Sequence, residues 1–239
     1  MKKTALVTGG VRRLGRDIAI ELDKLGYDVI VTYNKSKIPD VKKVNYAVAL
    51  KIDVTNTSEI KNLFSFINKR YKRLDVVINN AGIFRNIDFF KISEKDFDEF
   101  INTNLKSQFF ISQYASKLML KNKTSDINVP QIINIASLGA LQNWTGYIPY
   151  SISKSGVIKL TQQLAKRLAP DILVNSISPG TIIIENDEND TVNFNEMKKY
   201  PMKKFGDAKD ITSLIKFLVT ENKFITGHNF IVDGGKLLN

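Results

Sequence analysis

The segment Thr4-Ala-Leu-Val-Thr-Gly-Gly-Val-Arg-Arg-Leu-Gly15 predicts a buried strand, a glycine-bearing turn and the start of a helix. In this turn Gly9 permits a sharp change of direction, and Gly15 permits close packing of the helix against the strand. The helix is expected over Arg16–Leu25, with its N-terminal N–H groups and positive dipole end directed at an anion such as pyrophosphate. Strand, turn and helix in this order predict a dinucleotide site, although Arg13 stands where such turns often carry a middle glycine.

The rest of the chain alternates strand patterns with helical patterns. Further strands are expected at Asp28–Tyr33, Val48–Asp53, Leu74–Asn79, Gln131–Ala136, Asp171–Ile177 and Asn229–Val232. Helices are expected at Ser58–Arg73 (capped by Thr57 or Ser58), from Ser93 to about Leu120, around Tyr150 and at Asp207–Thr220. This alternation predicts an α/β protein with a Rossmann-type, doubly wound parallel sheet that binds ligands at the carboxyl ends of its strands. We expect one domain over residues 1–239, with a substrate-covering loop at about residues 182–204.

The end of the second strand indicates which dinucleotide binds. An acidic residue about 20 positions after the glycine turn would hydrogen-bond the ribose 2′-hydroxyl of NAD. This chain instead has Tyr33-Asn-Lys-Ser36, with Arg12 in the turn opposite. Cations and hydroxyls there suit the 2′-phosphate of NADP, which a carboxylate would repel, so the sequence favours NADPH. Asp53-Val54, at the end of the third strand, can hydrogen-bond the adenine.

A second motif carries the chemistry. Tyr150 and Lys154 are four residues apart, so they lie on one face of the expected helix. A phenol has an ordinary pKa of about 10, and an ammonium within about 4–6 Å is expected to lower that pKa toward neutral pH. Ser137 follows the strand upstream, where its hydroxyl can hold a substrate oxygen or nitrogen while Tyr150 protonates it. The pattern predicts that Tyr150 acts as a general acid.

The composition excludes several other function classes. The chain has no cysteine and one histidine, His228, so disulfides, thiolate catalysis, a Ser-His-Asp triad and His-rich metal sites are not expected. The net charge is +11, but the lysines are dispersed and form no dense basic arm, so nucleic-acid binding is not expected. There is no apolar run long enough to span a membrane and no signal-peptide pattern, so we expect a cytoplasmic protein with no membrane partner.

Taken together, these residues resemble the short-chain dehydrogenase/reductase family over nearly the whole chain. The matching pieces are Thr8-Gly9 to Gly15, Asn79–Gly82, Asn104, Ser137, Tyr150 to Lys154, Pro179-Gly180 and Val232–Gly235. The resemblance implies the strand order 3-2-1-4-5-6-7, usually a homotetramer, and a catalytic set of Asn104, Ser137, Tyr150 and Lys154. In that set Lys154 would also bind the nicotinamide ribose, and Asn104 would hold a water in a proton relay. The residues expected at the cofactor are Gly9, Arg12, Arg13, Leu14, Gly15, Tyr33, Asn34, Lys35, Ser36, Asp53, Val54, Asn80, Ala81, Gly82, Tyr150, Lys154, Pro179, Gly180 and Ile182.

Within that family the chain looks most like the pteridine reductases and dihydromonapterin reductases. It shares their basic pair Arg12-Arg13 and an aromatic residue, Phe84, where those enzymes place a ring that stacks on the pterin. The segments Leu168–Pro179 and Ile182–Asp187 resemble the dihydromonapterin reductases in order and length. The residues expected at the substrate are Arg13, Phe84, Ser137, Tyr147 and Tyr150.

One departure leaves the substrate open. The pterin enzymes usually carry an aspartate where this chain has Ser137, so 3-oxoacyl-[acyl-carrier-protein] reductase remains an alternative. The basic charge favours that alternative because acyl carrier proteins are acidic, whereas Arg13 and Phe84 favour the pterin enzymes. The sequence therefore predicts an NADPH-dependent reductase of a C=N or C=O bond in a small molecule, with a dihydropterin preferred. A non-catalytic NADP sensor on the same fold is a remote alternative.

Overall fold

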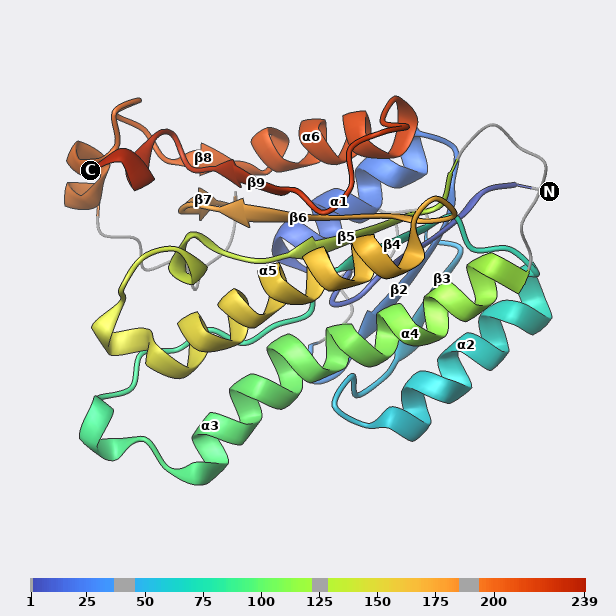
Figure 1. Cartoon of the computed structure of the whole chain (residues 1–239), viewed down its shortest axis with the longest axis horizontal. Helices are drawn as coiled ribbons and strands as arrows, with labels where there is room; N and C mark the ends of the chain where they lie inside the picture. Colours follow the sequence, from blue (N-terminus) through green and yellow to red (C-terminus); the bar gives the residue numbers. More distant parts are fainter. Residues whose placement is uncertain (1, 37–45, 122–128, 185–193) are drawn as a thin grey trace.

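The computed structural model describes residues 2–36, 46–121, 129–184 and 194–239, and within these ranges seven strands form one parallel sheet (Figure 1). The strand order is β3-β2-β1-β4-β5-β6-β9, which confirms the predicted order, since β9 is the seventh strand of this sheet. Two short strands, β7 and β8, pair only with each other. The bounds are β1 Thr4–Val7, β2 Asp28–Tyr33, β3 Val48–Lys51, β4 Val76–Asn79, β5 Gln131–Ile135, β6 Leu173–Pro179, β7 Ile182–Ile183, β8 Gly206–Asp207 and β9 Asn229–Val232.

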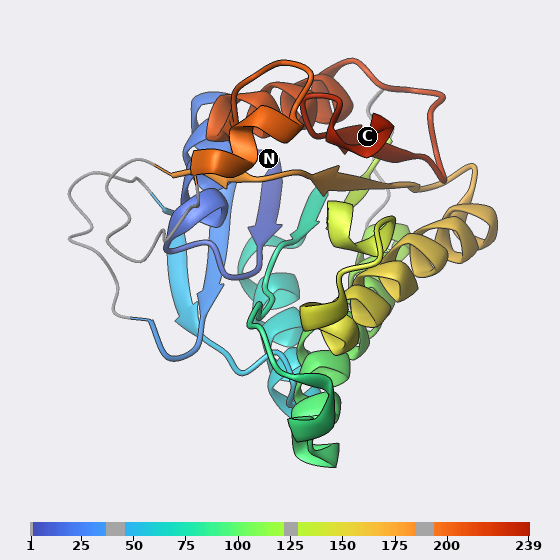
Figure 2. The same cartoon turned by 90° about the vertical axis from the view of Figure 1, so that its left-hand side faces the viewer.

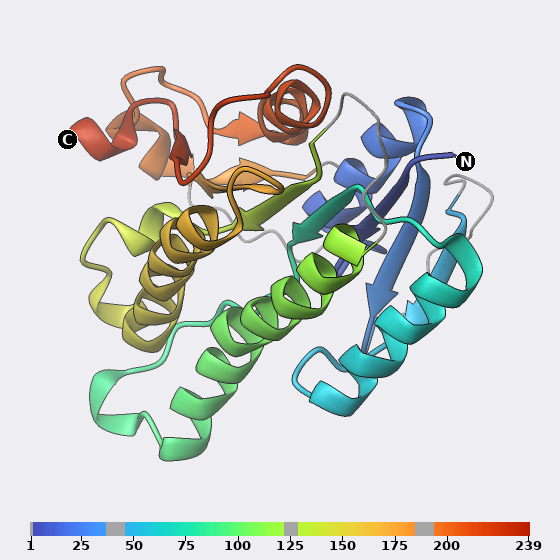
Figure 3. The same cartoon turned by 45° about the vertical axis from the view of Figure 1, so that its right-hand side comes forward.

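Helices cover both faces of the sheet, which is why its central strands are almost entirely apolar. Along β1, Ala5 and Val7 face the layer that contains α1 and α6, whereas Leu6 faces the layer that contains α2 and α4. Figure 2 shows the sheet between these layers, and Figure 3 shows α2, α4 and α5 side by side on one of them. The helix bounds are α1 Arg13–Lys24, α2 Thr57–Tyr71, α3 Glu94–Ile101, α4 Ser107–Lys121, α5 Ile148–Leu168 and α6 Ala208–Thr220.

Several helix boundaries differ from those predicted. Helix α1 begins at Arg13, three residues earlier than expected. Helix α2 is capped by Asn56, whose side-chain oxygen accepts from two main-chain N–H groups of the first turn, and not by Thr57 or Ser58. The long helix expected after Ser93 does begin there, with a capping box, but it is interrupted. A π-turn at Asn102–Lys106 separates α3 from α4.

The expected substrate loop is only partly described. Residues 185–193 lie outside the described ranges, and so do Asn186 and Asp187 of the motif noted above. The rest of the loop contains β7 and a 3-10 turn at Phe194–Lys199, so it is less irregular than predicted. Over the part of the chain that the structure covers, no helix combines the length and apolarity needed to cross a membrane.

Candidate active site

The glycine turn after β1 is held in place by the turn after β4. Gly9 has a φ of +63°, which a residue with a side chain rarely adopts. The side-chain amide of Asn80 donates to the main-chain oxygens of Thr8 (2.9 Å) and Gly9 (3.3 Å). The Thr8 hydroxyl in turn accepts from the main-chain N–H groups of Asn80 (3.0 Å) and Ala81 (2.9 Å). The Asn80 amide therefore shapes the turn, and its expected contact with a cofactor stays a prediction.

Helix α1 offers an anion its free N-terminus. No side chain caps it, and its first turn carries no acidic residue. In contrast, α2, α3 and α6 are capped by the side chains of Asn56, Ser93 and Asp207. Gly15 lies in the first turn so close to Gly9 that an added methyl group would overlap the Gly9 carbonyl oxygen. A close-packed turn with uncapped N–H groups fits a pyrophosphate, as the sequence predicted.

The basic pair and its neighbours take up different positions in this turn. Arg12 is the N-cap residue of α1 and is exposed. Arg13 follows with a φ of +48°, so it occupies the left-handed conformation in the place where a glycine was expected. Leu14 packs against the core layer formed with α1. The turn therefore keeps the backbone path of a glycine although it carries an arginine.

The end of β2 lies beside Asp53, as the adenosine site requires. Asn34 and Lys35 are exposed, Tyr33 and Ser36 are half-buried, and no carboxylate follows the strand directly. Burial raises the pKa of Asp53, but hydrogen bonds from Thr55 and Asn34 and the charge of Lys35 outweigh it, so the pKa lies below its ordinary value. Asp53 is therefore ionised at neutral pH and already engaged with this loop. Val54 is buried beside it.

The catalytic candidates meet where β5 ends and α5 begins. Ser137, Tyr150 and Lys154 are all buried, and the Ser137 side chain is hydrogen-bonded to Tyr150. The ammonium of Lys154 donates to the main-chain oxygen of Ile135 at 2.7 Å and lies 6.0 Å from the centre of the Tyr150 ring. The structure thus brings a serine hydroxyl, a phenol and an ammonium together.

The expected fall in the Tyr150 pKa is wrong. Burial raises the pKa of Tyr150 to about 12, although the hydrogen bond from Ser137 opposes this. Burial also lowers the pKa of Lys154 to about 8, because its ammonium is removed from water. The sequence could place the ammonium near the phenol, but it could not show how completely both would be buried.

Asn104 lies inside the molecule in the π-turn and is fully buried. Its side chain accepts from Ile83 N (2.8 Å) and donates to Ile83 O (3.1 Å) and Ser153 Oγ (3.0 Å). A methyl group on Gly82 would lie 3.2 Å from the Asn104 oxygen and 3.6 Å from the Lys154 nitrogen, so these three residues adjoin. The expected water held by Asn104 stays a prediction, since both amide hydrogens already have protein partners.

Aromatic rings surround the Tyr150 phenol. Phe84 is 58% exposed, stacks parallel on Tyr147 with ring centres 4.6 Å apart, and meets the Tyr150 ring edge-on at 4.8 Å. Trp144 lies parallel to Tyr150 at 6.5 Å, and its ring packs against Gly139. The sequence reasoning missed Trp144, although it is the only tryptophan in the chain and lies close to Tyr150 in the sequence. We call Phe84, Trp144 and Tyr147 the aromatic wall.

The remaining expected cofactor residues lie at the ends of β6 and β9. Pro179 closes β6, and Gly180 donates its N–H to the main-chain oxygen of Val232 at 2.9 Å. Ile182 pairs with Gly206 in the small sheet. Their contact with a cofactor stays a prediction.

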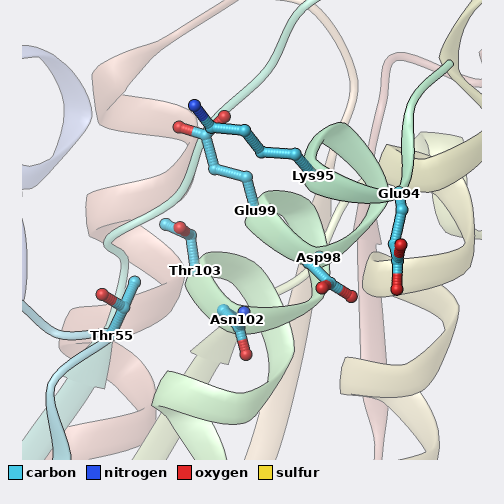
Figure 4. Close-up of a pocket in the computed structure, with 7 residues that line it drawn as sticks. All are labelled: Thr55, Glu94, Lys95, Asp98, Glu99, Asn102 and Thr103. Carbon is cyan, nitrogen blue, oxygen red and sulfur yellow. The ribbon is translucent and has the colours of Figure 1, made fainter.

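A pocket of about 430 Å³ lies on α3 (Figure 4). Its lining is Thr55, Glu94, Lys95, Asp98, Glu99, Asn102 and Thr103. None of these is a residue that the sequence analysis placed at a catalytic or cofactor position. Of the acidic groups, Glu99 is already paired with Arg85 at 2.7 Å. The pocket is therefore not the candidate active site.

Comparison with known proteins places this geometry in a family. The profile of a family described as Enoyl-(Acyl carrier protein) reductase matches residues 10–236. A 3-oxoacyl-[acyl-carrier-protein] reductase of Staphylococcus epidermidis is 34% identical over 247 residues, covering 98% of this chain and 99% of that protein. The structure resembles that of a putative short-chain alcohol dehydrogenase from Sinorhizobium meliloti (TM-score 0.87, 31% identity, 99% and 97% coverage).

The structure also resembles that of a 3-oxoacyl-[acyl-carrier protein] reductase from Brucella melitensis in complex with NAD. The TM-score is 0.91 and the sequence identity 26%, and the match covers 100% of this chain and 98% of that chain. These relatives agree with the alternative left open by Ser137 better than with the pteridine branch. The chain is an oxidoreductase and belongs to the short-chain dehydrogenase/reductase family.

Proposed function

We propose that this protein is an NADPH-dependent carbonyl reductase and that its substrate is a 3-oxoacyl thioester on an acyl carrier protein. The observation that carries the proposal is the hydrogen-bonded pair of Ser137 and Tyr150 beside the buried Lys154. The names of relatives similar over almost the whole chain support the substrate class. The net charge of +11 suits an acidic carrier protein.

The side chains have distinct roles in this proposal. A bound reduced nicotinamide would supply the hydride to the carbonyl carbon. Ser137 donates a hydrogen bond to the carbonyl oxygen, and the Tyr150 hydroxyl gives that oxygen its proton. A phenol whose pKa is about 12 stays protonated at neutral pH, so it is present as the acid. Because an alkoxide is a stronger base than a phenolate, the proton transfer remains downhill.

Lys154 serves both the acid and the cofactor. Once Tyr150 has lost its proton, the nearby ammonium stabilises the phenolate by charge attraction. The same group would hold ribose hydroxyls of the nicotinamide half. The burial that lowers its pKa also strengthens both interactions, because little water is present to screen them.

The preference for NADPH rests on the end of β2. Lys35 and Arg12 are exposed, so their charges are accessible to a 2′-phosphate. No carboxylate stands directly after β2 to bind the 2′-hydroxyl of NAD. Asp53 is nearby, but hydrogen bonds from Thr55 and Asn34 engage its carboxylate.

A dihydropterin is the second candidate, because of the aromatic wall. The exposed Phe84 ring lies directly beside the Tyr150 phenol and parallel to Tyr147. A flat heterocycle can stack on such a ring, whereas a flexible acyl chain gains nothing from the parallel geometry. In this reaction Tyr150 would give its proton to a ring nitrogen.

Oxidation of NADPH, followed with acetoacetyl-[acyl-carrier-protein], acetoacetyl-coenzyme A and a dihydropterin side by side, tests the proposal. We expect turnover with the acetoacetyl thioesters and a higher kcat/KM on the carrier protein than on coenzyme A. Turnover with the dihydropterin alone would favour the second candidate. Tight NADPH binding without turnover of any of the three would contradict a reductase and favour an NADP sensor.

A further inference from the structure

Ser153 lies between Tyr150 and Lys154 on α5 and is fully buried. Its hydroxyl donates to the main-chain oxygen of Tyr150 at 2.6 Å. The Ser153 hydroxyl oxygen also accepts a hydrogen bond from the Asn104 side-chain amide at 3.0 Å. A hydroxyl has one hydrogen to donate, so the bond to Tyr150 leaves its lone pairs for Asn104. The hydroxyl of Ser153 therefore acts as a donor toward Tyr150 and as an acceptor toward Asn104.

Asn104 connects this turn of α5 to the loop after β4. Its remaining two hydrogen bonds go to the N–H and the carbonyl of Ile83, the residue before Phe84. Gly82 in the same loop adjoins the Lys154 nitrogen. The Asn104–Ser153 bridge thus ties the helical turn that carries the acid to the loop that carries the aromatic wall residue.

We propose that Ser153 is a positioning residue for the proton donor, through which Asn104 sets the placement of Tyr150. The inference rests on the proposed role of Tyr150 as the acid. Loss of the Ser153 hydroxyl leaves one Asn104 amide hydrogen without its partner inside the protein, whereas the Tyr150 carbonyl keeps its main-chain bond within α5. The first turn of α5 then shifts to satisfy the Asn104 amide, because a buried polar group without a partner is costly. The phenol moves with that turn.

The helix supplies a matched control further along. Thr161 is also buried, donates its hydroxyl to the main-chain oxygen of Val157 (2.8 Å) and accepts from the side chain of Asn134 (2.8 Å). This repeats the pattern of Ser153, but nearly two turns beyond Lys154. Ser153→Ala and Thr161→Ala therefore each remove one hydrogen bond to a helix carbonyl and one from an asparagine side chain. Only the Ser153 hydroxyl is bonded to Tyr150, the proposed acid.

The experiment compares Ser153→Ala, Thr161→Ala, Asn104→Ala and the Asn104→Ala/Ser153→Ala double variant. We expect Ser153→Ala to lower kcat by about 10- to 100-fold, as misplacement of a reacting group does, with NADPH affinity unchanged. The solvent deuterium isotope effect on kcat rises, because proton transfer becomes slower. The double variant loses no more than the worse single variant, since both break one bridge. Thr161→Ala keeps the wild-type isotope effect.

A second readout does not depend on turnover. In protein labelled with ¹³C at the tyrosine ring carbon that bears the hydroxyl, Tyr150→Phe identifies the Tyr150 resonance. We expect Ser153→Ala and Asn104→Ala to move this resonance to similar positions and Thr161→Ala to leave it in place. An unmoved resonance in Ser153→Ala, or equal kinetic effects of Ser153→Ala and Thr161→Ala, would overturn the inference. Should the wild type reduce none of the acceptors, the proposed function fails and the resonance alone decides.

If Ser153→Ala does not fold, Asn104→Asp breaks the same bridge from the other side. An ionised carboxylate cannot donate to Ser153, but it still accepts from Ile83 N. The same shift of the Tyr150 resonance is expected from this variant. An unmoved Tyr150 resonance in Asn104→Asp would overturn the inference.

Discussion

The main-chain carbonyl of Gly9 occupies the space that a methyl group on Gly15 would need. The Asn80 amide nitrogen would also lie only 2.6 Å from that methyl group. We expect Gly15→Ala to lower the free energy of unfolding by about 1–3 kcal/mol, as overpacking does, and to weaken NADPH binding because the turn must move. Chemical denaturation and a fluorescence titration with NADPH measure the two effects.

Gly26→Ala is the control for this prediction. Gly26 has a φ of +85° and nothing within 4 Å of an added methyl group, so only its backbone is strained by the change. It should cost about 1–2 kcal/mol of stability and leave NADPH affinity unchanged. Equal loss of affinity in both variants would contradict the role of the Gly9–Gly15 turn.

The positive charges near the end of β2 predict a preference for NADPH over NADH. Replacing both Arg12 and Lys35 with alanine should weaken NADPH by roughly 10-fold or more, because charge-assisted hydrogen bonds to the 2′-phosphate are lost. NADH lacks that phosphate and should bind with nearly unchanged affinity. Isothermal titration with both cofactors measures this, with Lys24→Ala as a control at the far end of α1. Equal losses for NADPH and NADH would contradict the preference.

The lowered pKa of Lys154 predicts that the stability of the protein depends on pH. Its pKa is lowered from 10.5 to about 8, so between these values the unfolded chain holds a proton that the native state has released. Stability therefore rises with pH across that window, by about 3 kcal/mol in total, and Lys154→Met should lack this rise. Urea unfolding of both proteins between pH 7 and pH 10 measures it. Parallel pH profiles would contradict a pKa of Lys154 that burial lowers.

The substitution Phe84→Ala distinguishes between a dihydropterin and a 3-oxoacyl thioester as the substrate. If a dihydropterin stacks on this ring, Phe84→Ala lowers kcat/KM for it by roughly 2- to 10-fold, the range expected for an aromatic contact. Turnover of an acetoacetyl thioester should change little. Phe224→Ala, which removes a ring that is 93% exposed, serves as the control. An equal effect of Phe84→Ala on both substrates would show that the ring acts on Tyr150 and not on the substrate.

Much of the fold follows from local sequence. The strand Asp28–Tyr33 and the last strand Asn229–Val232 have the predicted bounds, because their apolar runs stop at polar or glycine residues. The sheet order follows from the resemblance to a family. The break in the long helix at Asn102–Lys106 could not be predicted, because a π-turn depends on tertiary bonds such as those of Asn104 and has no local signal.

The sequence predicts that Tyr150 and Lys154 lie together, but it does not predict their pKa values. The spacing of Tyr150 and Lys154 places them on one helix face, yet their pKa values depend on burial, which is set by residues far away in the sequence. Trp144 was missed because a loop aromatic has no periodic pattern. Its contact with Gly139 and its parallel position over Tyr150 arise only when the two loops meet.

The central claim is that the Tyr150 hydroxyl protonates the reduced substrate, and Tyr150→Phe tests it most directly. The change removes one oxygen and keeps the buried ring, so NADPH should bind as tightly as in the wild type. The rate of a single turnover with enzyme-bound NADPH should fall by about 10²- to 10⁴-fold, the usual contribution of a general acid. A single-turnover rate close to that of the wild type would contradict the account.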